Sequence, residues 1–153
     1  MRFPAVRGDN LLRQTVNLPH DLEGELNILL IAFQRWQQNM VDTWLPTVQH
    51  IEQAHPQVRY YELPTIQRLN VLAQTFINAG MRAGIPNPTA RERTITLYVD
   101  KAAFRRALEL PHEESIYVLL VDRQGQVLWR TEGAHTPDKA TALAAAIRAE
   151  EGP

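Results

Sequence analysis

The sequence contains no cysteine at all. Disulfides, zinc–thiolate sites, iron–sulfur clusters and thiol nucleophiles are therefore excluded for this chain. Dithiol exchange and cysteine-based peroxide reduction are excluded for the same reason, because both reactions proceed through a thiolate. The absence also removes any cysteine-based indication of the compartment in which the protein works.

The sequence also lacks an excess of either charge and any long apolar run. Sixteen Lys and Arg residues against 17 Asp and Glu give a formal net charge of -1, which provides no overall attraction to nucleic acid or to an anionic membrane. The longest uninterrupted apolar run, residues 28–33, is far short of the roughly 20 residues that span a bilayer. The first ten residues contain no apolar stretch of signal-peptide length. We therefore expect a cytoplasmic protein that neither crosses a membrane nor binds nucleic acid.

The size and the apolar content indicate one globular domain. The chain has 153 residues, of which 44% are hydrophobic and 22% are charged, as in ordinary globular proteins. No repeat and no linker interrupts it, so we expect a single domain over residues 1–153.

Strands are predicted wherever apolar or β-branched residues form short runs bounded by turn residues. Residues 26–33 are almost entirely apolar, which favours a central, parallel strand covered on both faces. The other predicted strands are residues 11–19 at an edge, residues 58–63 ending at Pro64, residues 94–99, and a hairpin of residues 116–121 and 126–130 around Gly125.

Helices are predicted between these strands. Residues 35–55 carry apolar side chains three and four positions apart, with Pro46 inside the helix, and residues 65–83 form a second amphipathic pattern. Asp100 can cap a short helix, and Thr136 followed by Pro137 can open a last helix over residues 139–149. The order predicts an α/β fold with a mixed sheet, helices on both faces and a closing hairpin followed by a helix.

Three local patterns resemble the thioredoxin superfamily in its longer, peroxiredoxin-like form. They are residues 31–33 leading into a Trp-bearing helix with Pro46, the hairpin over residues 117–127, and Gly133 after it. The resemblance implies that the two redox cysteines of the superfamily would fall at Gln38 and Val41, and its cis-proline at Ile116. Neither feature is present, so the implied fold lacks both its nucleophile and its substrate clamp.

Further segments are similar to the mitochondrial ATPase-complex assembly factor family. They are residues 8–11, Ala32-Phe33 with Trp44 downstream, residues 81–85, and the hairpin from Tyr117 to Gly133. The family is thioredoxin-like and is described as helping to assemble the membrane sector of ATP synthase. The first residues do not show the pattern of a transit peptide, so we expect a bacterial relative of this family. The resemblance implies a non-catalytic interaction or assembly module with a protein partner and no cofactor.

Aromatic and histidine side chains supply few candidate sites. Trp36, Met40 and Trp44 lie at helical spacing and are predicted to be core residues, whereas Trp129 on the closing hairpin is a candidate partner contact. Residues 112–114, a His followed by two Glu, are too few for a metal site in a surface loop, and no metal is expected.

Arginines supply the remaining candidate site. Arg82, Arg91 and Arg93, with Arg105 and Arg106 further on, could form a basic surface at one end of the sheet. The alternative function is therefore a cysteine-free enzyme or a binder of small anions with an arginine-lined pocket. Ordinary solvated loop residues would explain the same pattern, and homodimerisation through the hairpin or an exposed helix is compatible with either function.

Overall fold

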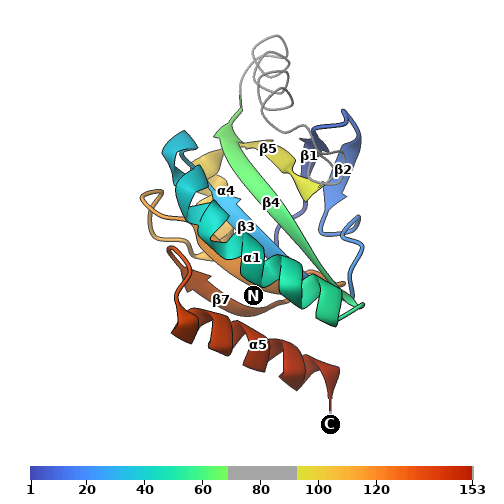
Figure 1. Ribbon diagram of the computed structural model, residues 1–153. Helices are drawn as coiled ribbons and strands as arrows, with labels where there is room; N and C mark the ends of the chain where they lie inside the picture. Colours follow the sequence, from blue (N-terminus) through green and yellow to red (C-terminus); the bar gives the residue numbers. More distant parts are fainter. Residues whose placement is uncertain (69–92, 153) are drawn as a thin grey trace.

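The computed structural model describes residues 1–68 and 93–152 (Figure 1). These residues form a seven-stranded sheet in the order β2-β1-β5-β4-β3-β6-β7. The strands are β1 (Val6–Asn10), β2 (Thr15–Leu18), β3 (Leu26–Ala32), β4 (Val58–Gln67), β5 (Ile95–Val99), β6 (Tyr117–Asp122) and β7 (Val127–Glu132). The described helices are the short 3₁₀ helix η1 (Arg35–Gln37), α1 (Gln38–Ala54), α4 (Lys101–Leu108) and α5 (Pro137–Glu151).

The helices cover both faces of the sheet. Figure 1 shows α1 and α5 together on one face and α4 behind the sheet. One core cluster joins Trp44 and Val48 of α1 to Leu143 and Ile147 of α5, and the other contains Phe104 of α4. The predicted mixed α/β sheet with two covered faces is confirmed.

The central strand is β3, as its apolar run predicts. It pairs in parallel with β4 and antiparallel with β6, and six of its seven residues are buried. The buried polar residue within it, Asn27, exchanges hydrogen bonds of 2.9 Å with the backbone N–H and C=O of Gly24. Asn27 therefore satisfies its amide inside the core while it holds the turn that leads into the strand.

The prediction of one edge strand over residues 11–19 is wrong. Residues 6–10 and 15–18 form the two strands of a hairpin, and the turn between them is built by Asn10. The Oδ1 atom of Asn10 accepts from the backbone N–H groups of Leu12 and Gln14 at 2.9 and 3.0 Å. Little in the sequence indicated β1, because its five residues include Gly8 and three polar side chains, and it becomes a strand through pairing with β2 and β5.

The prediction that Pro64 ends a strand is also wrong, because β4 continues to Gln67. Pro64 is opposite Ala32, the last residue of β3, and described pairing with β5 runs from Thr65 onward. Proline is tolerated there because β4 exchanges one neighbouring strand for another at this point, so neither ladder needs the missing N–H in its interior. The helix predicted over residues 65–83 consequently cannot begin at Thr65, and its part beyond residue 68 lies outside the described residues.

The helix ends and the closing hairpin are confirmed. Asp100 accepts a hydrogen bond from the Ala103 N–H, and Thr136 accepts one from the Lys139 N–H, as N-cap residues do. The closing hairpin turns at Gly125, whose φ of 88° is one that residues with a Cβ rarely adopt.

Candidate functional site

The end of β3 and the start of α1 form the candidate site, because this is where the redox cysteines of a thioredoxin-like protein are expected. Gln38, at the first of the two positions, begins α1. Its Nε2 atom donates to Asp42 Oδ1 at 2.9 Å and to Glu62 Oε1 at 3.1 Å. A neutral amide thus joins two carboxylates, one on its own helix and one on β4.

The second expected cysteine position holds a buried hydrocarbon side chain, which cannot take part in a reaction. Val41 is 1% exposed and belongs to the core cluster beneath α1. Ile116, at the expected cis-proline position, is fully buried in the same cluster. All three positions that would carry redox chemistry therefore hold residues with structural contacts.

Gln37 fixes the backbone between β3 and α1. Its side chain is fully buried, and its Oε1 atom accepts from the N–H groups of Phe33 and Gln34 at 2.8 and 3.2 Å. Its Nε2 atom donates to the carbonyl of Glu113 at 2.6 Å. A single amide side chain satisfies three backbone groups and ties this loop to the segment that precedes β6.

A second polar cluster supports the same loop from α4. Lys101 donates to the Phe33 carbonyl at 2.9 Å and lies 3.2 Å from Glu113 Oε1. The Nε atom of Arg105 lies 3.3 Å from Glu113 Oε2, outside hydrogen-bond geometry. One carboxylate therefore lies beside two cations: Lys101 also bonds the Phe33 carbonyl of the candidate site, whereas Arg105 donates to the carbonyls of Leu110 and Pro111.

Glu62 is the titratable group of this site with a displaced pKa. Burial raises the pKa of Glu62, the hydrogen bond from Gln38 opposes this rise, and the negative charge of Asp42 adds to it. The protonated form is favoured because the half-buried carboxyl has only a neutral donor and another acid beside it.

The Trp36, Met40 and Trp44 prediction is partly wrong. Trp44 is fully buried, and its indole N–H donates to the Gly133 carbonyl at 3.0 Å, and Met40 packs against the same core. Trp36 is instead 55% exposed. The physical reason is that Trp36 lies in η1, whose tighter 3₁₀ winding rotates it away from the buried stripe of α1.

The predicted arginine site is described only in part. Arg82 and Arg91 lie outside the described residues. Arg93 forms an ion pair with Glu52, donates to the Tyr60 carbonyl at 3.1 Å, and has its guanidinium 4.8 Å from the Tyr60 ring. Arg93 therefore joins α1 to β4 through contacts that occupy its guanidinium.

Trp129 and the predicted histidine cluster have structural neighbours too. Trp129 is half-buried on β7 and packs against the core cluster beneath α1 and α5. His112 accepts from the Glu114 N–H through Nδ1 and lies 3.1 Å from Glu132 through Nε2. Within residues 1–68 and 93–152, no group of three or more His, Asp or Glu side chains is placed to hold a metal ion.

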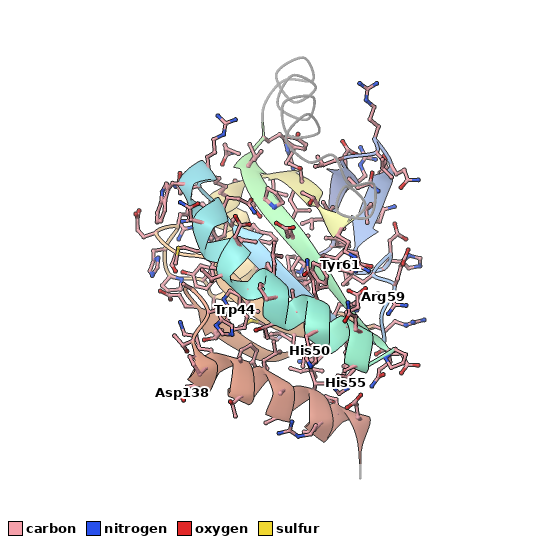
Figure 2. All side chains as sticks on the ribbon, viewed as in Figure 1. Trp44, His50, His55, Arg59, Tyr61 and Asp138 are labelled. Carbon is pink, nitrogen blue, oxygen red and sulfur yellow. The ribbon has the colours of Figure 1, made fainter. Side chains whose placement is uncertain are left out.

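Figure 2 shows how α1 connects to its surroundings through labelled residues. Trp44 points from α1 toward the start of α5, and His55, at the other end of α1, lies near the end of α5. His55 Nδ1 is 2.9 Å from a carboxylate oxygen of Glu151.

An open acidic pocket lies near the C-terminal ends of α1 and α5. It is lined by Glu25, Leu26, Gln57, Asp122, Glu150 and Glu151. It adjoins the first residue of β3, whereas the candidate site adjoins the last.

A family comparison decides the identity of the chain. Residues 1–149 match the family model described as ATP10 protein. The chain belongs to the ATP10 family. Members of this family are ATP synthase assembly factors with a thioredoxin-like fold. A comparison with curated proteins finds no match.

Solved structures place this ATP10 chain within the thioredoxin-like fold. BsSco, a member of the Sco family of cytochrome c oxidase assembly proteins, has a TM-score of 0.63 at 12% identity, covering 95% of this chain and 92% of its own. Arabidopsis thaliana ScoI with copper bound has a TM-score of 0.61 at 11% identity, covering 97% and 99%. The exposed lipoprotein thioredoxin of Streptococcus pneumoniae has a TM-score of 0.58 at 12% identity, covering 94% and 98%. At these identities the likeness establishes the fold alone.

Sequence reasoning missed the contacts that build the site. Asp42 and Glu62 lie 20 residues apart in different elements, yet Gln38 brings them together. The available signal for Glu62 was an acid between two buried apolar residues of β4, Tyr61 and Leu63. Nothing in the sequence indicated the role of Gln37, because a buried glutamine cannot be distinguished from a solvated one within a polar stretch.

Among residues 1–68 and 93–152, none of the helices combines the length and the apolar character that a membrane span requires.

Proposed function

We propose that this ATP10-family chain is a non-catalytic interaction module that acts in the assembly of ATP synthase. Membership of the family supports the assembly role. The single observation that supports the non-catalytic part is the replacement of the redox pair: Gln38 is engaged by two carboxylates, and Val41 is buried. A scaffold whose reactive positions hold structural contacts is suited to binding rather than to chemistry.

In this proposal the partner is a protein, the protein works in the cytoplasm, and no nucleic acid or cofactor takes part. The membrane sector of ATP synthase is the proposed target. A homodimer is compatible with the same role, because two copies could present two binding surfaces to one complex.

The test is deletion and complementation in the native host, with assembled ATP synthase measured on native gels. Deletion lowers the amount of assembled complex, and the wild-type chain restores it. Gln38→Ala restores it as well, because the proposal requires no reaction at position 38. Protein levels are measured by immunoblot, so that a loss of Gln38→Ala through degradation is recognised.

Two outcomes contradict the proposal separately. Unchanged ATP synthase after deletion removes the assembly role. Failure of Gln38→Ala at wild-type protein level, melting temperature and affinity for the partner contradicts the non-catalytic part of the proposal, because the amide would then act in a step other than binding.

The residues predicted from the sequence to contact a partner are tested by substitution in the same complementation experiment. We propose Arg82, Arg91 and Trp129 as partner contacts, each tested by replacement with Glu or, for Trp129, with Ala. Arg93→Glu is read together with its melting temperature, because Arg93 also pairs with Glu52. A thermal shift on adding inorganic phosphate, without any effect of these variants on assembly, would instead favour an anionic-ligand site lined by Arg82, Arg91 and Arg93.

A further inference from the structure

Trp36 is the most exposed large apolar side chain in the described part of the chain. It is 55% exposed, whereas the next, Met1 at the chain terminus, is 41% exposed. The other two tryptophans are buried or half-buried in the core beneath α1 and α5. An indole has a larger apolar surface than a leucine side chain, so that leaving it in water costs more free energy.

The backbone that carries Trp36 is held in place on both sides. Gln34 and Gln37 form a reciprocal capping box around η1, in which each side chain bonds the backbone of the other. Gln37 also bonds Phe33 and Glu113, and Lys101 bonds the Phe33 carbonyl. Trp36 is therefore presented by a loop that is already ordered, so that binding through it loses little conformational entropy.

The residues next to Trp36 in the sequence are polar, and three of the four that are not buried carry amide side chains. Arg35, Gln38 and Asn39 are exposed and Gln34 is half-buried, so the segment offers one cation and three amides. Arg35 forms no ion pair with any residue that the structure describes. Trp and Arg are the residue types most enriched at the energetic centres of protein interfaces, where amides form the hydrogen-bonding rim.

The edges of the sheet are less suited to a partner, because outward backbone groups on each edge already form bonds within the chain. On β2, both backbone groups of Asn17 bond Asp21 at 2.7 Å. On β7, the Val127 N–H bonds the Met1 carbonyl, and Lys139 bonds the Glu132 carbonyl. A partner that added a strand to either edge would have to displace these contacts.

We infer that Trp36 and Arg35 form the anchor by which this chain binds its protein partner, and that the partner offers an apolar pocket for the indole and a carboxylate for the guanidinium. The inference rests on the proposed function, since it names the contact that an assembly module would use. The indole leaves water on binding, and the planar guanidinium pairs with the carboxylate through two parallel hydrogen bonds.

The test measures binding of the purified chain to the detergent-solubilised membrane sector of ATP synthase from the native host, by biolayer interferometry. Trp36→Ala weakens binding at least ~10-fold, because truncation of a buried interface anchor has an effect of that size. Arg35→Glu weakens it further than Arg35→Ala, since it places a carboxylate against a carboxylate. Trp36→Phe retains part of the affinity, because a phenyl ring fills part of the same pocket.

Gln49→Ala is the matched control, since Gln49 is also exposed on α1 but lies three turns along the helix. It leaves the affinity unchanged, and circular dichroism and melting temperature show each variant to be folded. Wild-type affinity in Trp36→Ala overturns this inference and leaves the proposed function standing. Absence of binding by the wild-type chain overturns both.

Discussion

The carboxyl group of Asp21 closes the outer edge of the sheet at Asn17. Asp21 Oδ2 accepts from the Asn17 N–H at 2.7 Å, and the Asp21 N–H donates to the Asn17 carbonyl, also at 2.7 Å. Asn17 lies on β2, an edge strand, and is opposite Arg7 in the hairpin. Both backbone groups that would otherwise invite another strand are therefore satisfied within the chain.

Asp21→Ala is expected to destabilise the protein and to expose this edge. The loss of the side-chain hydrogen bond lowers the free energy of unfolding by about 1 kcal/mol, measured by urea denaturation. The opened edge promotes self-association, measured by light scattering at increasing protein concentration. Asp21→Asn keeps an acceptor oxygen and serves as the control. A monomeric Asp21→Ala at high concentration would show that the edge is protected by other means.

The same contact predicts a loss of stability in acid. The hydrogen bond from the Asn17 backbone, with the neighbouring His20, holds the pKa of Asp21 below its ordinary value of 3.8. A carboxyl whose pKa is lowered on folding stabilises the protein above its ordinary pKa, and this contribution disappears as the pH falls through the lowered value. The difference in unfolding free energy between wild type and Asp21→Asn should therefore shrink below about pH 4, measured by urea denaturation at each pH. A constant difference would contradict the lowered pKa.

The contribution of Glu62 to stability is expected to depend on pH in the opposite direction to that of Asp21. Burial raises the pKa of Glu62 above 4.5, so its contribution to stability is complete below pH 4.5 and is lost as the pH rises through the raised value. Glu62→Gln keeps an acceptor for the Gln38 amide and removes the titration. The variant should therefore be more stable than wild type at pH 8, with the difference declining toward pH 4.5.

Asp42→Asn supplies the control for that experiment, because the charge of Asp42 contributes to the raised pKa of Glu62. A double-mutant cycle on Glu62 and Asp42 tests this coupling. The melting temperatures of the wild type, both single variants and the double variant are measured from pH 4.5 to pH 8. Additive effects of the two substitutions would show that the acids do not interact.

Gln37→Ala is expected to be the most damaging single change at the candidate site. It removes three hydrogen bonds and leaves the Phe33 N–H and the Glu113 carbonyl without their partner inside the protein. The free energy of unfolding should fall by about 2–3 kcal/mol, measured by urea denaturation. Gln38→Ala, one residue later on the exposed surface, should cost less than half as much. Equal effects would show that burial of the amide does not matter.

Arg130→Ala tests the link between β7 and α4. The Arg130 guanidinium donates to the carbonyls of Leu108 and Glu109, at 2.6 and 3.0 Å, and so satisfies the C-terminal end of α4. Its loss should lower the free energy of unfolding by about 1–2 kcal/mol. Arg130→Lys should recover only part of this, because an ammonium group cannot reproduce the planar pair of donors. Full recovery by lysine would mean that charge alone acts at this helix end.

Most strands and helices could be predicted because their signals are local. The apolar run of β3, the cap residues Asp100 and Thr136, and the turn at Gly125 each act within a few residues of themselves. The strand β1, which lies between β2 and β5, and the passage of β4 through Pro64 could not be predicted, because both depend on pairing with neighbouring strands. The burial of Trp36 was predicted wrongly because a periodicity argument assumes one helical winding, and the helix here opens with a 3₁₀ turn.

By itself, the sequence determined the chemistry that this protein cannot perform and the class of fold it adopts. A missing thiol is a property of composition that no folding can alter, and hydrophobic periodicity acts along the chain. Only the tertiary structure decided what replaced the redox site: Gln38 meets Glu62 across 24 residues, and Gln37 meets Glu113 across 76. Contacts at such separations depend on how the sheet orders its strands, so the amides, acids and exposed indole of this site take their roles only once the chain has folded.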